Sequence, residues 1–277
     1  MFAHEFMRNA YLAGTFVALA CGLIGYFVVL RGQVFAGDAL SHVAFTGALA
    51  AAAAGIDIRL GLFAATILVA LGMGGLGSRS RPDDVVIGSV FAWVLGLGVL
   101  FLSLFVNGSS GSDGTAAVRV LFGSILGLSA ADARLAAVIA IAAASALLAI
   151  ARPLLFSSLD PEVARGLGMP VRALGLGFFA ILAVVAAEAT QAVGALLLLG
   201  LLAAPGGAAR LLTDNPWRGL AISAAIAVGS TWLGLFLSYE IDSLPAGTAV
   251  IGVATAAFAA AALARANLGQ VRRIGAR

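Results

Sequence analysis

The chain has 277 residues, of which 62% are hydrophobic and 10% are charged, and its mean hydropathy is +1.08. Soluble domains carry about 25% charged residues, so this composition excludes a soluble globular protein and indicates an integral membrane protein. All 16 basic residues are arginine, in short segments between apolar runs, and the formal net charge is +3. This pattern is typical of membrane topology signals and gives no indication of nucleic-acid binding.

The residue types that are missing limit the chemistry further. The chain contains no lysine, and a Walker A motif needs a lysine at the nucleotide phosphates, so ATP hydrolysis would have to come from another subunit. One cysteine, Cys21, and two histidines are too few for a structural zinc site of the Cys/His type. Neither a complete Ser-His-Asp set nor an HExxH motif is found, so we do not expect an enzyme.

Nine apolar runs approach the roughly 20 residues that a membrane-spanning helix needs. A tenth piece, Val120 to Ser129, is too short to span and could be re-entrant or interfacial. The runs are rich in alanine and in the 35 glycines, small residues that allow close helix packing in lipid. We predict a single all-α transmembrane domain over residues 1–277, with about eight or nine spans. The runs cover residues 10–30, 39–55, 60–77, 85–106, 132–151, 171–188, 192–211, 218–238 and 246–263.

The distribution of arginine predicts the orientation, because cytoplasmic loops are enriched in basic residues. Nine alternating spans with a cytoplasmic C-terminus leave four arginines outside, namely Arg8, Arg59, Arg119 and Arg134. The other twelve then face the cytoplasm: Arg31, Arg79, Arg81, Arg152, Arg165, Arg172, Arg210, Arg218, Arg265, Arg272, Arg273 and Arg277. This asymmetry favours an external N-terminus in a multi-pass protein of the cell membrane.

The segment from Leu30 to His42 carries two titratable side chains at the start of the second span. Asp38 and His42 are four residues apart, so a helix places them on one face. Ionisable residues inside spans are rare and often functional, and a carboxylate with an imidazole suits a divalent transition metal. Two ligands are too few for tight binding, which favours a transient transport site.

Structural interpretations of the same pair stay open. Asp38 follows Gly37 and could merely be the N-cap of the second span. His42 could be an interior histidine that packs without a ligand role. If the pair does contact metal, we expect it near the middle of the membrane.

Three further positions are candidates for function. Glu188, at the outer end of the sixth span, could be a third metal ligand or part of an acidic vestibule, although an exposed boundary carboxylate is the simpler interpretation. Glu240 and Asp242 could attract cations at the outer face, or belong to a solvated loop. Pro205, followed by two glycines, suggests a kink or break in the seventh span.

The longest cytoplasmic loop predicts a short helix within residues 158–168. Asp160 is a favourable N-cap, Pro161 fits the first helical position, and Glu162 suits the positive end of the helix. Gly168, or the glycine two residues before it, can end the helix. The helix could lie on the membrane surface as a connector or dock into a cytoplasmic partner.

Five motifs are spread in order along nearly the whole chain. The first is the arginine-ended first helix with GDALSH at Gly37–His42, and the second is LFGSILGLS at Leu121–Ser129. The others lie at Ser158–Gly168, Val193–Ala209 and Gly234–Gly247. Together they resemble the permease subunits of metal-importing ABC transporters, the ABC-3 family of zinc, manganese and iron importers.

This resemblance implies a fold and a set of partners. The fold would be the all-helical type II importer fold, with two permease copies forming a dimer among the membrane lipids. An extracytoplasmic metal-binding protein would deliver Zn²⁺, Mn²⁺ or Fe²⁺. Asp38 and His42 would contact the metal ion transiently during transport. No cofactor would be bound permanently. Cytoplasmic ABC ATPase subunits would dock on the 158–168 segment as a coupling helix, through Asp160, Pro161, Glu162, Arg165 and Gly168. A stand-alone secondary metal transporter or channel is the alternative.

Overall fold

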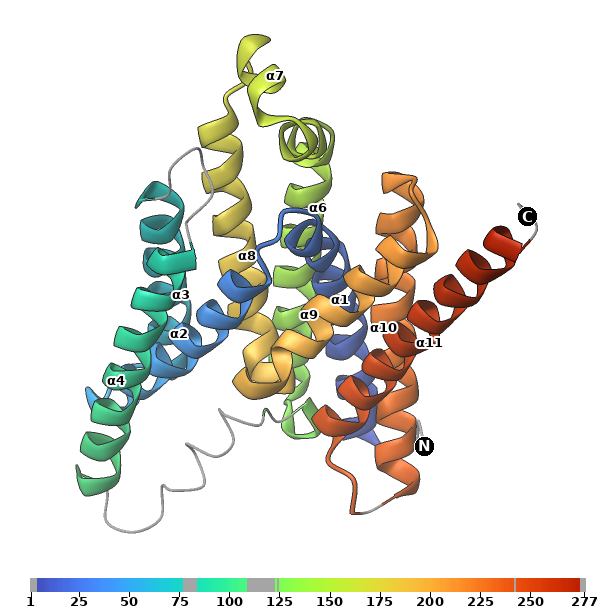
Figure 1. Cartoon of the computed structure of the whole chain (residues 1–277). Helices are drawn as coiled ribbons and strands as arrows, with labels where there is room; N and C mark the ends of the chain where they lie inside the picture. The colour runs from blue at the N-terminus through green and yellow to red at the C-terminus, as the bar shows by residue number, and fades with distance from the viewer. Residues whose placement is uncertain (1–3, 77–83, 109–122, 124, 242, 275–277) are drawn as a thin grey trace.

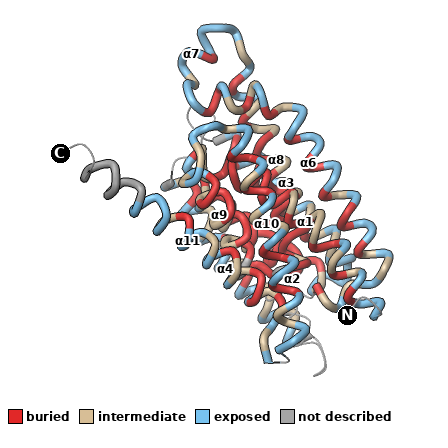
Figure 2. The backbone as a smooth tube through the Cα atoms, turned by 90° about the vertical axis from the view of Figure 1, so that its right-hand side faces the viewer, coloured by how far each residue is buried: buried red, intermediate tan, exposed pale blue. Residues whose placement is uncertain are grey.

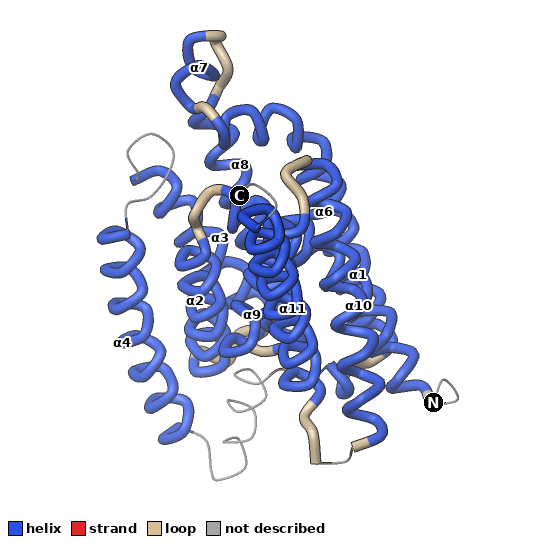
Figure 3. The backbone as a smooth tube through the Cα atoms, turned by 45° about the vertical axis from the view of Figure 1, so that its right-hand side comes forward, coloured by secondary structure: helices blue, strands red, loops and turns tan. Residues whose placement is uncertain are grey.

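The structure is a computed structural model that describes residues 4–76, 84–108, 123, 125–241 and 243–274. In this part of the chain every regular element is a helix and there is no strand (Figure 3). The helices are α1 (Glu5–Leu30), α2 (Val34–Ala53), α3 (Ile58–Leu76), α4 (Asp84–Gly108), the 3₁₀ helix η2 (Ile125–Gly127), α6 (Ala130–Leu159), α7 (Pro161–Gly166), α8 (Val171–Val193), α9 (Ala195–Leu212), α10 (Pro216–Glu240) and α11 (Ala246–Ile274).

Successive long helices run in alternate directions, as the apolar runs predict (Figure 1). The short helix α7 projects at one end of the bundle, which we call the inner end. The turn between α1 and α2 and the C-terminal end of α11 face the same way, whereas the N-terminus lies toward the opposite, outer end (Figure 1). Arg31, Arg165 and Arg210, at or near the ends of α1, α7 and α9, therefore lie toward this inner end.

Helix α1 lies at the centre of the bundle and is among the most buried elements (Figure 2). It packs mainly against α10, α6 and α9, with α8 alongside. Glycines allow this close approach: a Cβ atom on Gly206 of α9 would lie 2.6 Å from the Gly25 carbonyl oxygen, and one on Gly22 would lie 2.8 Å from Ala224 Cα. The glycine-rich spans thus bring backbones together, as packing in lipid requires.

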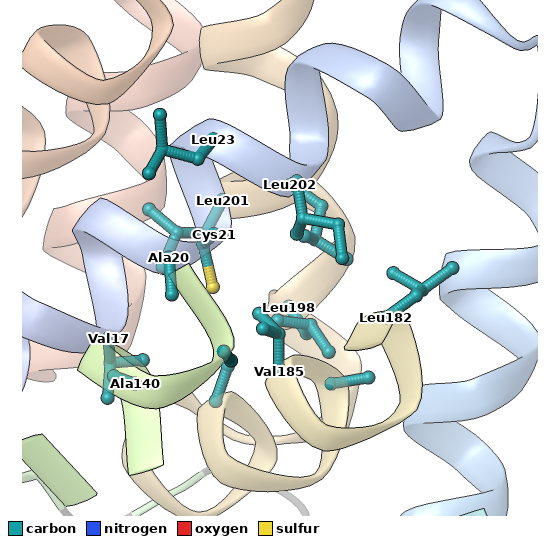
Figure 4. Close-up of a cluster of buried hydrophobic side chains, with 14 of the residues drawn as sticks. Val17, Ala20, Cys21, Leu23, Ala140, Leu182, Val185, Leu198, Leu201 and Leu202 are labelled. Carbon is teal, nitrogen blue, oxygen red and sulfur yellow. The ribbon is translucent and has the colours of Figure 1, made fainter. Parts of the chain in front are cut away.

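The core around Cys21 is shared by α1, α6, α8 and α9 (Figure 4). Cys21 is fully buried and its sulfur lies among Val17, Leu182, Val185 and other apolar side chains. The cysteine is therefore a packing residue.

The described helices agree with the prediction of about eight or nine spans, whereas the suggested break at Pro205 is absent. Eight described helices are long and apolar enough to cross a membrane, and the run at 192–211 forms the shorter helix α9. Its 18 residues extend about 27 Å, less than the roughly 30 Å hydrocarbon core, although it still connects α8 to the inner end of α10 (Figure 1). The helix continues through Pro205 without a break. Of the 120–129 piece, the described part forms only the 3₁₀ turn η2, which packs on α1.

The second span begins earlier than residue 39. Helix α1 ends at Leu30, and a turn of three residues leads into α2 at Val34. Gly32 occupies the turn at φ +67°, a left-handed conformation that glycine adopts without strain. This early start changes the positions of Asp38 and His42 within the helix.

Candidate metal site

Asp38 and His42 both lie inside α2, on one side of the helix. They are the fifth and ninth residues of this 20-residue helix, roughly 6 Å and 12 Å along its axis from Val34. The N-cap residue is Gln33, which makes no side-chain capping bond. The interpretation of Asp38 as the N-cap is therefore wrong, because the helix has already begun one turn earlier. The pair occupies the inner half of α2, with His42 approaching its middle.

A cavity of about 240 Å³ lies beside Asp38, between α2 and α4. Its lining residues are Phe35 and Asp38 of α2 with Ile87, Gly88 and Phe91 of α4. Four of the five are apolar, so the carboxylate of Asp38 is the charged group at the edge of this space. A water molecule occupies about 30 Å³ of liquid, so a cation with several waters fits here.

The imidazole of His42 is held by an aromatic contact. It is half-buried, and its ring lies edge-on to Phe91, with centroids 5.1 Å apart and an interplanar angle of 71°. Edge-to-face contacts of this kind orient the ring. One aromatic side chain thus both borders the Asp38 cavity and packs on His42, so a packing role and a ligand role are compatible.

Helix α4 packs against the polar side of α2, a contact that the sequence did not predict. Beyond His42, Thr46 donates a hydrogen bond to the Val94 carbonyl oxygen at 3.2 Å. A Cβ atom on Gly98 would lie 2.9 Å from the Thr46 hydroxyl oxygen, so glycine permits the contact. In the sequence, the spacing of Gly88, Phe91 and Gly98 along one helical face was the feature that could have indicated this packing.

Glu188 is buried in α8, only 3% exposed, so the interpretation as an exposed boundary carboxylate is wrong. Its Oε1 atom lies 3.9 Å from an Arg59 nitrogen, and the same guanidinium lies 3.3 Å from Asp132 Oδ1 and donates to Gln191 at 3.3 Å. An arginine between the two carboxylates disfavours a cation there. The residues that line the Asp38 cavity do not include Glu188.

Within the described ranges, no three His, Cys, Asp or Glu side chains are close enough to hold a metal ion together. Glu240 is exposed at the end of α10, and Asp242 lies outside the described residues, so the outer acidic pair stays a prediction.

The predicted inner-end helix is present as α7, Pro161–Gly166. Asp160 caps it by accepting hydrogen bonds from the backbone nitrogens of Glu162 and Val163, at 3.2 and 3.0 Å. Pro161 is at the start, Arg165 is in the last turn, and Gly168 has a φ of +78°. Glu162 and Arg165 are exposed, and the helix projects beyond the neighbouring helix ends (Figure 1).

Comparison with known proteins identifies the class of protein. The chain matches the profile of the ABC 3 transport family over residues 3–265. It belongs to this family. A manganese transport system membrane protein, MntC of Listeria monocytogenes, is 31% identical over 92% of this chain and 89% of its own length. A probable iron transport system membrane protein of Haemophilus influenzae is 31% identical over 86% of each chain.

A solved structure supports the same assignment. PsaBC from Streptococcus pneumoniae in complex with Fab contains a chain that is similar in fold, with a TM-score of 0.81 and 25% sequence identity. The match covers 93% of this chain and 91% of the other. This ABC 3 family member therefore has the expected importer-type helical fold and is a multi-pass protein of the cell membrane. Membership in an ABC family overturns the alternative of a stand-alone secondary transporter or channel.

Proposed function

We propose that this chain is the permease subunit of an ATP-driven importer of divalent transition metals. The observation that carries the proposal is the pairing of Asp38 and His42 on one side of α2, beside a cavity, in a member of the ABC 3 transport family. Relatives named as manganese and iron transport proteins support Mn²⁺ or Fe²⁺ as the cargo. A carboxylate with an imidazole also suits Zn²⁺.

In this mechanism Asp38 and His42 are transient ligands. The carboxylate offers charge and oxygen donors, the imidazole offers a nitrogen, and water completes the coordination of the ion. Because two protein ligands hold an ion only weakly, the metal can leave toward the cytoplasm when the helices rearrange. Glu188 has a different environment, paired with Arg59, and its proposed role as a third ligand is the weakest part of the site.

We further propose partners at both ends of the chain. Helix α7 and its exposed Glu162 and Arg165 are proposed to dock on cytoplasmic ATPase subunits, which supply the hydrolysis that a chain without lysine cannot perform through a Walker A motif. An extracytoplasmic metal-binding protein would deliver the ion at the outer end. A second copy of the chain would complete a dimer of single-domain permeases.

Uptake by the reconstituted complex tests the site. The chain is assembled with its ATPase and binding-protein partners in liposomes, and ATP-dependent uptake of Mn²⁺ is measured with Zn²⁺ or Fe²⁺ as competitor. Asp38→Asn and His42→Gln should each lower uptake more than about tenfold, since even outer partners of metal ligands change affinity by about 10–100-fold. Folding and association with the ATPase should not change.

Matched controls exist for both variants. Asp57→Asn alters an exposed aspartate that caps α3 by accepting from Arg59 and Leu60 nitrogens, a role that asparagine also fills. His4→Gln alters the other histidine, which is exposed. Uptake at the unaltered rate by both Asp38→Asn and His42→Gln would eliminate the proposed site.

A further inference from the structure

Arg31, directly after the end of α1, is a buried arginine that connects separate parts of the bundle. Its residue is only 7% exposed. The Nε atom donates to Gln33 Oε1 at 3.0 Å, and Nη1 donates to Ser158 Oγ at 3.0 Å. The guanidinium also lies over the ring of Phe178, with its central carbon 5.1 Å from the ring centroid. One side chain thus contacts the α1–α2 turn, the end of α6 and helix α8.

Each of these contacts lies next to a functional element. Gln33 is the N-cap of α2, five residues before Asp38. Ser158 lies two residues before Asp160, which caps α7. Phe178 belongs to α8, the helix that follows α7 along the chain. Arg31 therefore stands between the helix that carries the metal ligands and the segments that flank the proposed docking helix.

The chemistry of these contacts makes the connection stiff. The Ser158 hydroxyl donates to the Leu154 carbonyl oxygen at 2.6 Å, which fixes its orientation and leaves its lone pairs to accept from Arg31. The guanidinium is a planar fork that stacks on aromatic faces. It also lies at the C-terminal ends of α1 and α6, where helix dipoles favour positive charge. Separating the segments would break hydrogen bonds of a buried charge to Gln33 and Ser158, so the segments should move together.

We propose that Arg31 is a positioning residue that couples movement at α7 to the metal-binding helix α2. This inference rests on the proposed function, because it takes α7 as the contact for the ATPase and Asp38 with His42 as the metal ligands. When the ATPase displaces α7, the end of α6 moves, and the Arg31–Ser158 hydrogen bond carries that displacement to the start of α2. The Asp38 end of α2 then shifts against α4, which opens or closes the cavity.

Another route could carry the same signal. Helix α8 follows α7 and packs directly against α2, so helix packing alone could move the site. The two routes differ in what they require of Arg31. Packing between α8 and α2 does not depend on the hydrogen bond from Arg31 to Ser158, whereas the proposed route does.

The test measures metal transported per ATP hydrolysed in liposomes that contain the full complex. The variants are Arg31→Gln, Arg31→Lys and Ser158→Ala, and Mn²⁺ is the probe. Ser157→Ala is the matched control, because Ser157 is also buried and donates to the same Leu154 carbonyl oxygen, at 3.0 Å, on the residue next to Ser158. Arg172→Gln is a second control, because it removes an exposed arginine at the start of α8, toward the inner end where Arg31 lies.

We expect Arg31→Gln to lower the Mn²⁺ to ATP ratio by about tenfold, within the usual range of coupling between sites. Ser158→Ala should lower the ratio in the same direction, and Arg31→Lys should retain part of it because the charge remains. Mn²⁺ binding to the detergent-solubilised chain should be unchanged in all three. The two controls should keep the ratio of the unaltered complex.

Two results would overturn the inference. One is an unaltered ratio in both Arg31→Gln and Ser158→Ala, which would assign coupling to the packing of α8 on α2. The other is an equal loss in Ser157→Ala, which would mean that any change at the end of α6 has this effect. If Arg31→Gln does not fold, the Mn²⁺ to ATP ratio of Ser158→Ala alone decides whether the inference holds. Failure of the proposed function is distinct, since the unaltered complex would then show no ATP-dependent uptake.

Discussion

Arg59 joins the outer ends of three helices through its guanidinium group. It lies in the first turn of α3, contacts Asp132 at the start of α6, and reaches Glu188 and Gln191 near the end of α8. Glu188 Oε2 is buried and has no hydrogen-bond partner among the described residues. The charge of Glu188 is therefore compensated mainly by Arg59, which makes the pair sensitive to the loss of either member.

Removal of Arg59 should destabilise the chain strongly. In Arg59→Gln, Glu188 would keep a buried charge without its cation, which costs about 3–5 kcal/mol in comparable pairs. We expect a lower unfolding temperature of the detergent-solubilised protein. A second change, Glu188→Gln, in the same chain should recover much of the loss because the uncompensated charge disappears.

Arg134→Gln is the control for this pair, since Arg134 is exposed on α6 and its loss should have little effect. An unfolding temperature that is equal in Arg59→Gln and the unaltered chain would contradict the assigned role. So would a double variant that is no more stable than the single one.

At the scale of elements, α7 is a short helix whose existence depends on its cap. Six residues are too few for stable helix formation without outside support, and Asp160 accepts two of the backbone N–H groups at its start. The cap is worth about 0.5–2 kcal/mol in typical helices. The shape of the proposed docking surface should therefore depend on this one side chain.

Asp160→Ala should fray α7 and lower metal-stimulated ATP hydrolysis in the assembled complex severalfold, whereas Asp160→Asn should keep both the cap and the activity. Glu162→Ala combined with Arg165→Ala changes the exposed surface of α7 while it leaves the cap in place. This double variant should weaken coupling without any change in metal selectivity. Hydrolysis at the unaltered rate in both Asp160→Ala and the double variant would argue against docking at α7.

The sequence predicted helix α7 correctly but placed the start of α2 too late, and the difference has a physical reason. The signals for α7 are local, because a cap, a proline and a glycine within nine residues determine where the helix starts and ends. The start of α2 is not determined in this way. Gly37-Asp38 has the chemistry of a helix start, yet Gly32 makes the turn and the helix begins at Val34, where packing against the rest of the bundle decides.

Tertiary contacts explain what else the sequence did not reveal. Hydropathy locates spans but not their neighbours, so the position of Phe91 over His42 could not be derived. Glu188 lies at the end of an apolar run, which suggested an exposed position. Its contact with Arg59, 129 positions earlier in the chain, explains how the carboxylate can be buried. The family resemblance, the helical class and the pairing of Asp38 with His42 on one face all came from the sequence, because they depend on order and spacing.

At the scale of the whole molecule, the orientation can be tested with single cysteines. Cys21 is fully buried, so Cys21→Ala gives a background without a reactive thiol. Into it, Leu167→Cys places a thiol at the inner end and Ile56→Cys places one at the outer end, at positions that are 70% and 57% exposed. In intact cells, a membrane-impermeant maleimide should label Ile56→Cys and should label Leu167→Cys only after the membrane is opened. The reverse pattern would invert the topology.

Helix α8 is held near each end by an arginine from elsewhere in the chain, and Arg31 is buried whereas Arg59 is partly exposed. Phe178 lies under Arg31 toward the inner end, and Glu188 faces Arg59 toward the outer end. These attachment points are ten residues apart, or about 15 Å along the axis. A rod fixed at two such points cannot slide lengthwise without breaking one of them, but it can turn about the line that joins them. A lengthwise shift of α8 would therefore disturb the Arg31 contact and the Arg59 contact together.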